Sequence, residues 1–103
     1  MIAKPFIIQD DHYQANQSWC LDRIYSLGQH RIRVKIRRNA YDEQSYAVVE
    51  SWHMSGWQQI AHRHISFLAC KTVSYQGKDG QRALFDKDAV SLYHMALAVL
   101  GVS

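Results

Sequence analysis

HRIRVKIRR, residues His30–Arg38, decides the fold of this chain. Apolar residues at Ile32, Val34 and Ile36 alternate along it with basic ones. The basic positions are Arg31, Arg33, Lys35 and Arg37. Because successive side chains of a strand point to opposite sides of a sheet, this alternation predicts a strand with one apolar face and one basic face.

The segments on either side of this strand predict an antiparallel meander. Ser18–Ser26 reads as the preceding strand and joins it through a three-residue turn at Leu27–Gln29. Ser45–Met54 reads as the following strand, after a polar loop. A two-residue turn at Ser55 and Gly56 then leads into a further strand, Trp57–Ile65.

The two ends of the chain complete the predicted fold. Phe6–Ile8 forms a short edge strand behind Pro5, and 10–17 forms a polar loop. Residues 66–75 fit either a strand or a helix face, and we favour a strand. Asp86 caps a C-terminal helix over 89–100, which is apolar enough to be largely buried, in the core or in a subunit interface; core is the commoner case. Gly101 ends it.

The predicted class is therefore α+β: an antiparallel meander of four to five strands with the C-terminal helix packed on one sheet face. The 103 residues are expected to form a single domain, 1–103. Two cysteines and a short, acid-flanked apolar run at the start favour a cytoplasmic protein with reduced thiols and no membrane segment. The net charge of +3 makes an anionic partner worth testing.

Turn lengths set the register and hence the composition of each face. The predicted turns place Ile24, Ile32, Val34, Ile36, Ala47, Val49 and Ile60 on the apolar face, beneath the helix. The opposite face, with its mixture of cations and rings, is the predicted partner-binding site. Its residues are Trp19, Arg23, Tyr25, Arg31, Arg33, Lys35, Arg37, Tyr46, Trp52 and Arg63.

Three interpretations fit such a face. Cations that follow a phosphate backbone and rings that stack on bases are typical of proteins that bind single-stranded nucleic acid, which is our preferred hypothesis. Trp, Tyr and Arg are also enriched at protein interfaces, so the same face could bind a protein partner or form a homodimer, with no role in nucleic-acid binding. The third interpretation is an ordinary solvated surface with cross-strand pairs such as Arg33–Glu50.

Catalysis, cofactors and metals are not indicated. No nucleophile motif is present, and Gly77–Gly80 lacks the spacing of a phosphate-binding loop, so we expect a non-enzymatic binding module without a cofactor. His62 and His64 share one side of a strand, which supplies half a metal site. Because no third ligand is evident nearby, we expect no metal.

Overall fold

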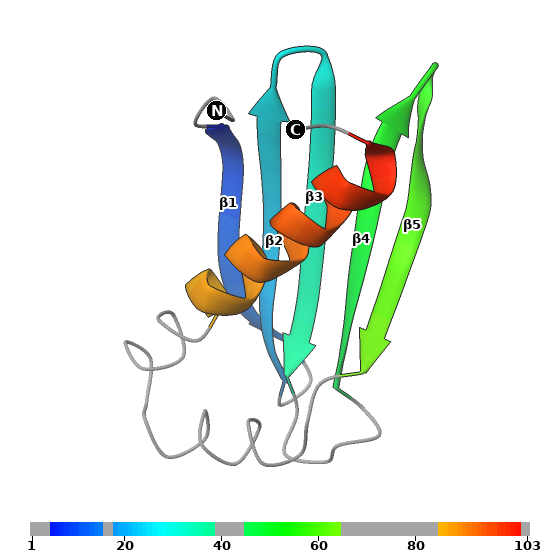
Figure 1. Cartoon of the computed structure of the whole chain (residues 1–103). Coiled ribbons are helices and arrows are strands. Elements are labelled where there is room, and N and C mark those ends of the chain that lie inside the picture. Colours follow the sequence, from blue (N-terminus) through cyan, green and yellow to red (C-terminus); the bar gives the residue numbers. More distant parts are fainter. Residues whose placement is uncertain (1–4, 16–17, 39–44, 65–84, 102–103) are drawn as a thin grey trace.

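The computed structural model describes residues 5–15, 18–38, 45–64 and 85–101. Their strands form one sheet of five, ordered β1-β2-β3-β4-β5, with each strand antiparallel to the next (Figure 1). The strands are β1 Phe6–Ala15, β2 Ser18–Leu27, β3 His30–Arg38, β4 Tyr46–His53 and β5 Gly56–His64. The C-terminal helix, residues 85–100, lies diagonally across one side of the sheet. The predicted α+β meander with a C-terminal helix is confirmed.

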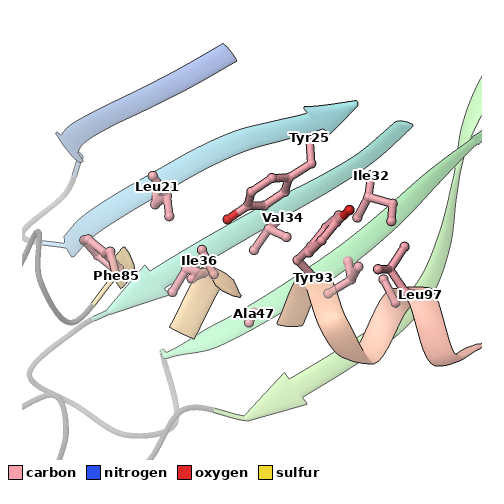
Figure 2. Packing of buried hydrophobic residues seen from close by; sticks show 12 residues of the cluster. Leu21, Tyr25, Ile32, Val34, Ile36, Ala47, Phe85, Tyr93 and Leu97 are labelled. Carbon is pink, nitrogen blue, oxygen red and sulfur yellow. The ribbon is translucent and has the colours of Figure 1, made fainter. Parts of the chain in front are cut away.

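The core lies between the helix and the middle of the sheet (Figure 2). The apolar side of β3 supplies Ile32, Val34 and Ile36, each at most 2% exposed. Helix residues spaced three or four apart face them, as expected for one face of a helix. These residues are Phe85, Ala89, Tyr93, Ala96 and Leu97. Ala89 and Ala96 of the helix are fully buried in this cluster.

β1 is longer than its sequence suggests. The strand predicted at Phe6–Ile8 is present, but it continues through Ala15, so the prediction of a loop from Asp10 onward is wrong for the described residues. The pairing with β2 has an irregularity at Ile8, between Ile7 and Gln9. An edge strand with one side in solvent tolerates polar residues, and polarity therefore did not exclude a strand here.

The hairpin between β2 and β3 corrects the predicted register. Its turn has two residues, Gly28 and Gln29, since Leu27 pairs with His30. Gly28 has a φ of 59°, and a glycine with positive φ at the first turn position is typical of a type II′ hairpin. The turn is one residue shorter than predicted, so every side chain of β2 lies on the face opposite to the predicted one.

The predicted pairing of β3 with β4 is confirmed, with Arg33 opposite Glu50 and Arg37 opposite Tyr46. The next turn is at Met54 and Ser55, one residue earlier than predicted. An irregularity between Val49 and Glu50 then changes the alternation along β5.

Of the two predicted helix termini, the C-terminal one is confirmed and the N-terminal one is not. Gly101 has a φ of 72° and donates its N–H to the Ala98 carbonyl over 3.2 Å, which confirms it as the residue after the helix. Asp86 is already helical, so the prediction that it caps the helix is wrong. The strand favoured at 66–75 lies outside the described residues. The described part of the chain contains no helix with the length and apolar character needed to span a membrane.

Candidate functional site

The candidate site is the open face, by which we mean the side of the sheet opposite the helix. Within the described part of the chain, no element packs on it. Cross-strand pairing arranges its side chains in rows. One row joins Tyr13, Cys20, Arg37 and Tyr46; the next joins Asp11, Asp22, Lys35, Val48 and His62; a third joins Gln9, Ile24, Arg33, Glu50 and Gln59. The central strand β3 therefore carries a line of cations, with the rings of Tyr46 and Trp52 beside it on β4 and the ring of Tyr13 two strands away on β1.

Most of the predicted site lies on this face. Arg31, Arg33, Lys35, Arg37, Tyr46 and Trp52 are all there, brought together by the confirmed pairing of β3 with β4. Arg31 is exposed and forms no ion pair with a described residue. Tyr46 and Trp52 are 37% and 42% exposed, so their rings are accessible to a partner.

Four predicted site residues lie on the other side of the sheet. The register of β2 places Trp19, Arg23 and Tyr25 beneath the helix, opposite Arg38, Val34 and Ile32 respectively. Tyr25 belongs to the core, and Trp19 packs against it. Arg63 pairs with Ala47 and so also leaves the open face, because of the irregularity in β5. The assignment of these residues to the basic face is wrong.

Arg23 instead joins three elements. Its Nε lies 2.9 Å from Asp10 Oδ1 on β1, and its Nη2 lies 2.6 Å from Asp86 Oδ1 on the helix. It also donates to the Tyr25 hydroxyl over 3.3 Å. Burial lowers the pKa of the guanidinium, but these hydrogen bonds outweigh it and raise the pKa, so Arg23 stays charged. Arg23 is committed to this buried network.

The structure adds rings that the sequence reasoning missed. Trp57 pairs with Trp52 at the end of the open face, with ring centroids 5.3 Å apart at 77°. Tyr13 lies on the same face of β1, and His62 stacks on Tyr46 at a centroid distance of 5.8 Å. A turn at Met54 would have revealed Trp57 opposite Trp52, but no glycine or proline marks that position.

Arg33 is the most constrained cation of the open face. It donates from Nε to Glu50 Oε1 over 2.7 Å, and its guanidinium carbon lies 4.5 Å from the centroid of the Trp57 ring. The hydrogen bond from Arg33 is the main cause that lowers the pKa of Glu50, with Lys35 contributing from 3.9 Å. Arg33 therefore neutralises the carboxylate of Glu50. The other cations of the open face, which can neutralise an anionic partner, are Arg31, Lys35 and Arg37.

A depression that we call the tyrosine hollow crosses this face between Tyr13 on β1 and Tyr46 on β4. Its volume is about 300 Å³, and Lys35 and Arg37 lie between the two rings. Its full lining is Tyr13, Cys20, Asp22, Lys35, Ile36, Arg37, Tyr46, Val48, Glu50 and Gln59. Burial, followed by the charge of Asp22, raises the pKa of Tyr13 to about 12, so its hydroxyl is a proton donor at neutral pH. Burial likewise raises the pKa of the Cys20 thiol.

A larger hollow of about 530 Å³ lies on the other side of the sheet, between β1 and the helix. Ile7 and Val90 line it, together with Tyr25 and Arg23. Arg23 in this hollow is already paired with Asp10 and Asp86. The hollow is therefore a poorer binding site for an anion than the open face.

Among the described residues, no group of three or more His, Cys, Asp or Glu side chains is placed to hold a metal ion. Comparisons of the whole chain with protein-family models, with curated proteins and with solved structures found no match. The functional argument therefore rests on the geometry of the open face.

Proposed function

We propose that this protein is a non-enzymatic binding module whose open face binds single-stranded nucleic acid. The observation that carries the proposal is the line of cations along β3, next to a strand, β4, that carries two exposed rings. Arg31, Lys35 and Arg37 supply the positive charge. Tyr46 and Trp52 supply the rings, one near each end of β4 and both on the open face. A cytoplasmic location, expected from the cysteine content, belongs to the same proposal.

The two kinds of side chain serve different parts of a nucleic acid strand. Cations neutralise phosphates and release bound counterions, which gives affinity without sequence preference. Rings stack on unpaired bases, and each stacked base contributes about 1–3 kcal/mol. Bases in a duplex are already stacked on one another, so a face that combines rings with cations favours a single strand.

A protein partner or a second copy of the chain is the competing proposal for the same face. The exposed indole of Trp52, which lies against Trp57 near the hairpin end, supports it, since tryptophan is frequent among the residues that dominate protein interfaces. The two proposals differ in their dependence on salt. An interface anchored by tryptophan should respond weakly to ionic strength, whereas phosphate binding should respond strongly.

The test is fluorescence anisotropy of labelled single-stranded DNA, RNA and duplex DNA at about 50 and 200 mM salt. We expect the single strands to bind more tightly, with affinity falling steeply between the two salt concentrations. The variant K35A/R37A should bind at least about tenfold more weakly, and the slope of log affinity against log salt should become shallower by about 0.7 for each phosphate that is no longer neutralised.

Lys87→Ala is the matched control, because Lys87 is an exposed cation on the helix, on the other side of the molecule. It lowers the net charge without changing the open face, so binding should be close to that of the native chain. The proposal fails if no single strand binds at the lower salt, or if K87A weakens binding as much as K35A/R37A does.

A further inference from the structure

Two carboxylates line the tyrosine hollow, and a surface that only binds phosphate needs neither. Glu50 is paired with Arg33, whereas Asp22 has no such partner among the described residues. Asp22, half-buried on β2, places its carboxylate between the cations of the hollow and the ring of Tyr13. Its Oδ2 accepts a hydrogen bond from the Tyr13 hydroxyl over 3.2 Å. Among the described residues no cation lies within ion-pairing distance of Asp22, and no other hydrogen bond reaches its second oxygen.

The surroundings of Asp22 suit a flat ring with a polar edge. Tyr46, across the hollow on β4, lies two strands away from Asp22 and one row further along, which separates the two backbone positions by about 12 Å. One side of the Tyr46 ring is stacked on His62, with 12° between the ring planes, which fixes its orientation. Lys35 and Arg37 on β3 lie between these two walls. A base that enters the hollow beside Tyr46 would have Asp22 on its β2 side, and the cations of β3 would lie near its flanking phosphates.

We propose that the hollow holds one unpaired base carrying an exocyclic amine, with the Asp22 carboxylate accepting a hydrogen bond from that amine. The inference rests on the proposed function and specifies the base. Cytosine presents an N4 amine that Asp or Glu accepts, whereas thymine presents the O4 acceptor at the equivalent position. An acceptor facing the Asp22 carboxylate brings two acceptors together with no donor between them, which adds repulsion, so thymine and uracil bind poorly there.

Asp22 is therefore the residue that determines specificity, and the cations determine overall affinity. Cytosine and thymine are the most informative pair because both are pyrimidines of similar size, so stacking and backbone interactions are closely matched. The expected preference is on the order of tenfold for the one base that occupies the hollow.

The experiment measures anisotropy of labelled oligodeoxycytidine and oligodeoxythymidine, each of about twelve nucleotides, within the range one such surface covers. The native chain should bind oligodeoxycytidine about tenfold more tightly. In Asp22→Asn the preference should fall to near unity, mainly through tighter binding of oligodeoxythymidine, because an amide can either donate or accept. Asp11→Asn is the matched control: Asp11 is the cross-strand neighbour of Asp22, outside the hollow, and this variant removes the same charge while the preference remains.

Equal binding of the two oligonucleotides by the native chain overturns this inference and leaves the proposed function standing. The inference also fails if D22N keeps the preference, or if D11N loses it as fully as D22N does. The native comparison decides the matter even if D22N does not fold. Failure of both oligonucleotides to bind overturns the inference and the proposed function together.

Discussion

Two arginines on neighbouring strands, Arg23 and Arg33, show how strongly the role of one residue depends on its side of the sheet. Arg23 is 4% exposed and joins β1 to the helix through Asp10 and Asp86. Arg33, on the open face, joins Glu50 to the ring of Trp57. Both are paired, but only the second lies where a partner can reach it. The buried arginine connects elements of the fold, and the open one lies on the face that we propose binds a partner.

Replacement of Arg23 by methionine tests the structural role. We expect the free energy of unfolding to fall by about 2 kcal/mol, because the partly exposed Asp10 and Asp86 would lose their common partner. Urea denaturation measures this change. Arg31→Met is the control, since Arg31 is exposed and should alter stability little. If R23M kept the stability of the native chain but lost nucleic-acid binding, the structural role would be wrong and Arg23 would be a binding residue.

Glu50 gives the fold a specific dependence on pH. Its folded pKa is lowered, chiefly by the hydrogen bond from Arg33, so its contribution is fully present above the ordinary value of 4.5 and is lost as the pH falls through the folded pKa. The stability difference between the native chain and Glu50→Gln should therefore be constant near neutrality and shrink in acid. Urea titrations at several pH values measure it. A difference that grows in acid would contradict the assigned pairing.

At the scale of the element, turns decide which side of a strand faces the helix. Gly28 has positive φ, a conformation that costs residues with a Cβ about 1–2 kcal/mol. Gly28→Ala should therefore lower the free energy of unfolding by about 1 kcal/mol. Gly56→Ala is the control, because Gly56 lacks positive φ and its added Cβ would meet nothing within 4 Å. Equal losses in the two variants, measured by urea denaturation, would show that the turn is not as described.

The elements were more predictable than their registers. β3 has an unambiguous alternation of apolar and basic residues. The length predicted for the polar loop before β4 gave the register that pairs Val34 with Val49 in the core. β2 is different: each of its sides carries apolar residues and one charge, with Asp22 on one side and Arg23 on the other. Its pattern therefore did not choose between the two registers, and the turn length did. No residue type in the sequence of β4 or β5 indicated the irregularity in their pairing.

The same reason separates the residues whose side of the sheet was predicted correctly from those whose side was predicted wrongly. Residues on β3 and β4 depend on one well-defined pairing, and they were placed correctly. Trp19, Arg23 and Tyr25 depend on a turn, and Arg63 depends on an irregularity that only the pairing reveals. Tyr13 was missed because the polar sequence of β1 indicated a loop.

For the molecule as a whole, the sheet separates two tasks. One side, which the helix crosses (Figure 1), holds the apolar core and the Arg23 network. The other side carries the cations of β3 and the rings of β4. The three tryptophans of the chain report on both sides. Trp19 packs against the core on the helix side, whereas Trp52 and Trp57 lie together on the open face. They supply an internal control for any binding measurement.

The most direct test of the account is an NMR titration of the three indole N–H signals with single-stranded DNA, at about 50 mM salt. We expect the Trp52 and Trp57 signals to move in proportion to bound strand, and the Trp19 signal to stay in place. The shifts should reverse when the salt is raised to about 200 mM, as counterions displace the strand. Movement of Trp19 with Trp52 and Trp57 unchanged would place the binding surface on the helix side, and would contradict the account.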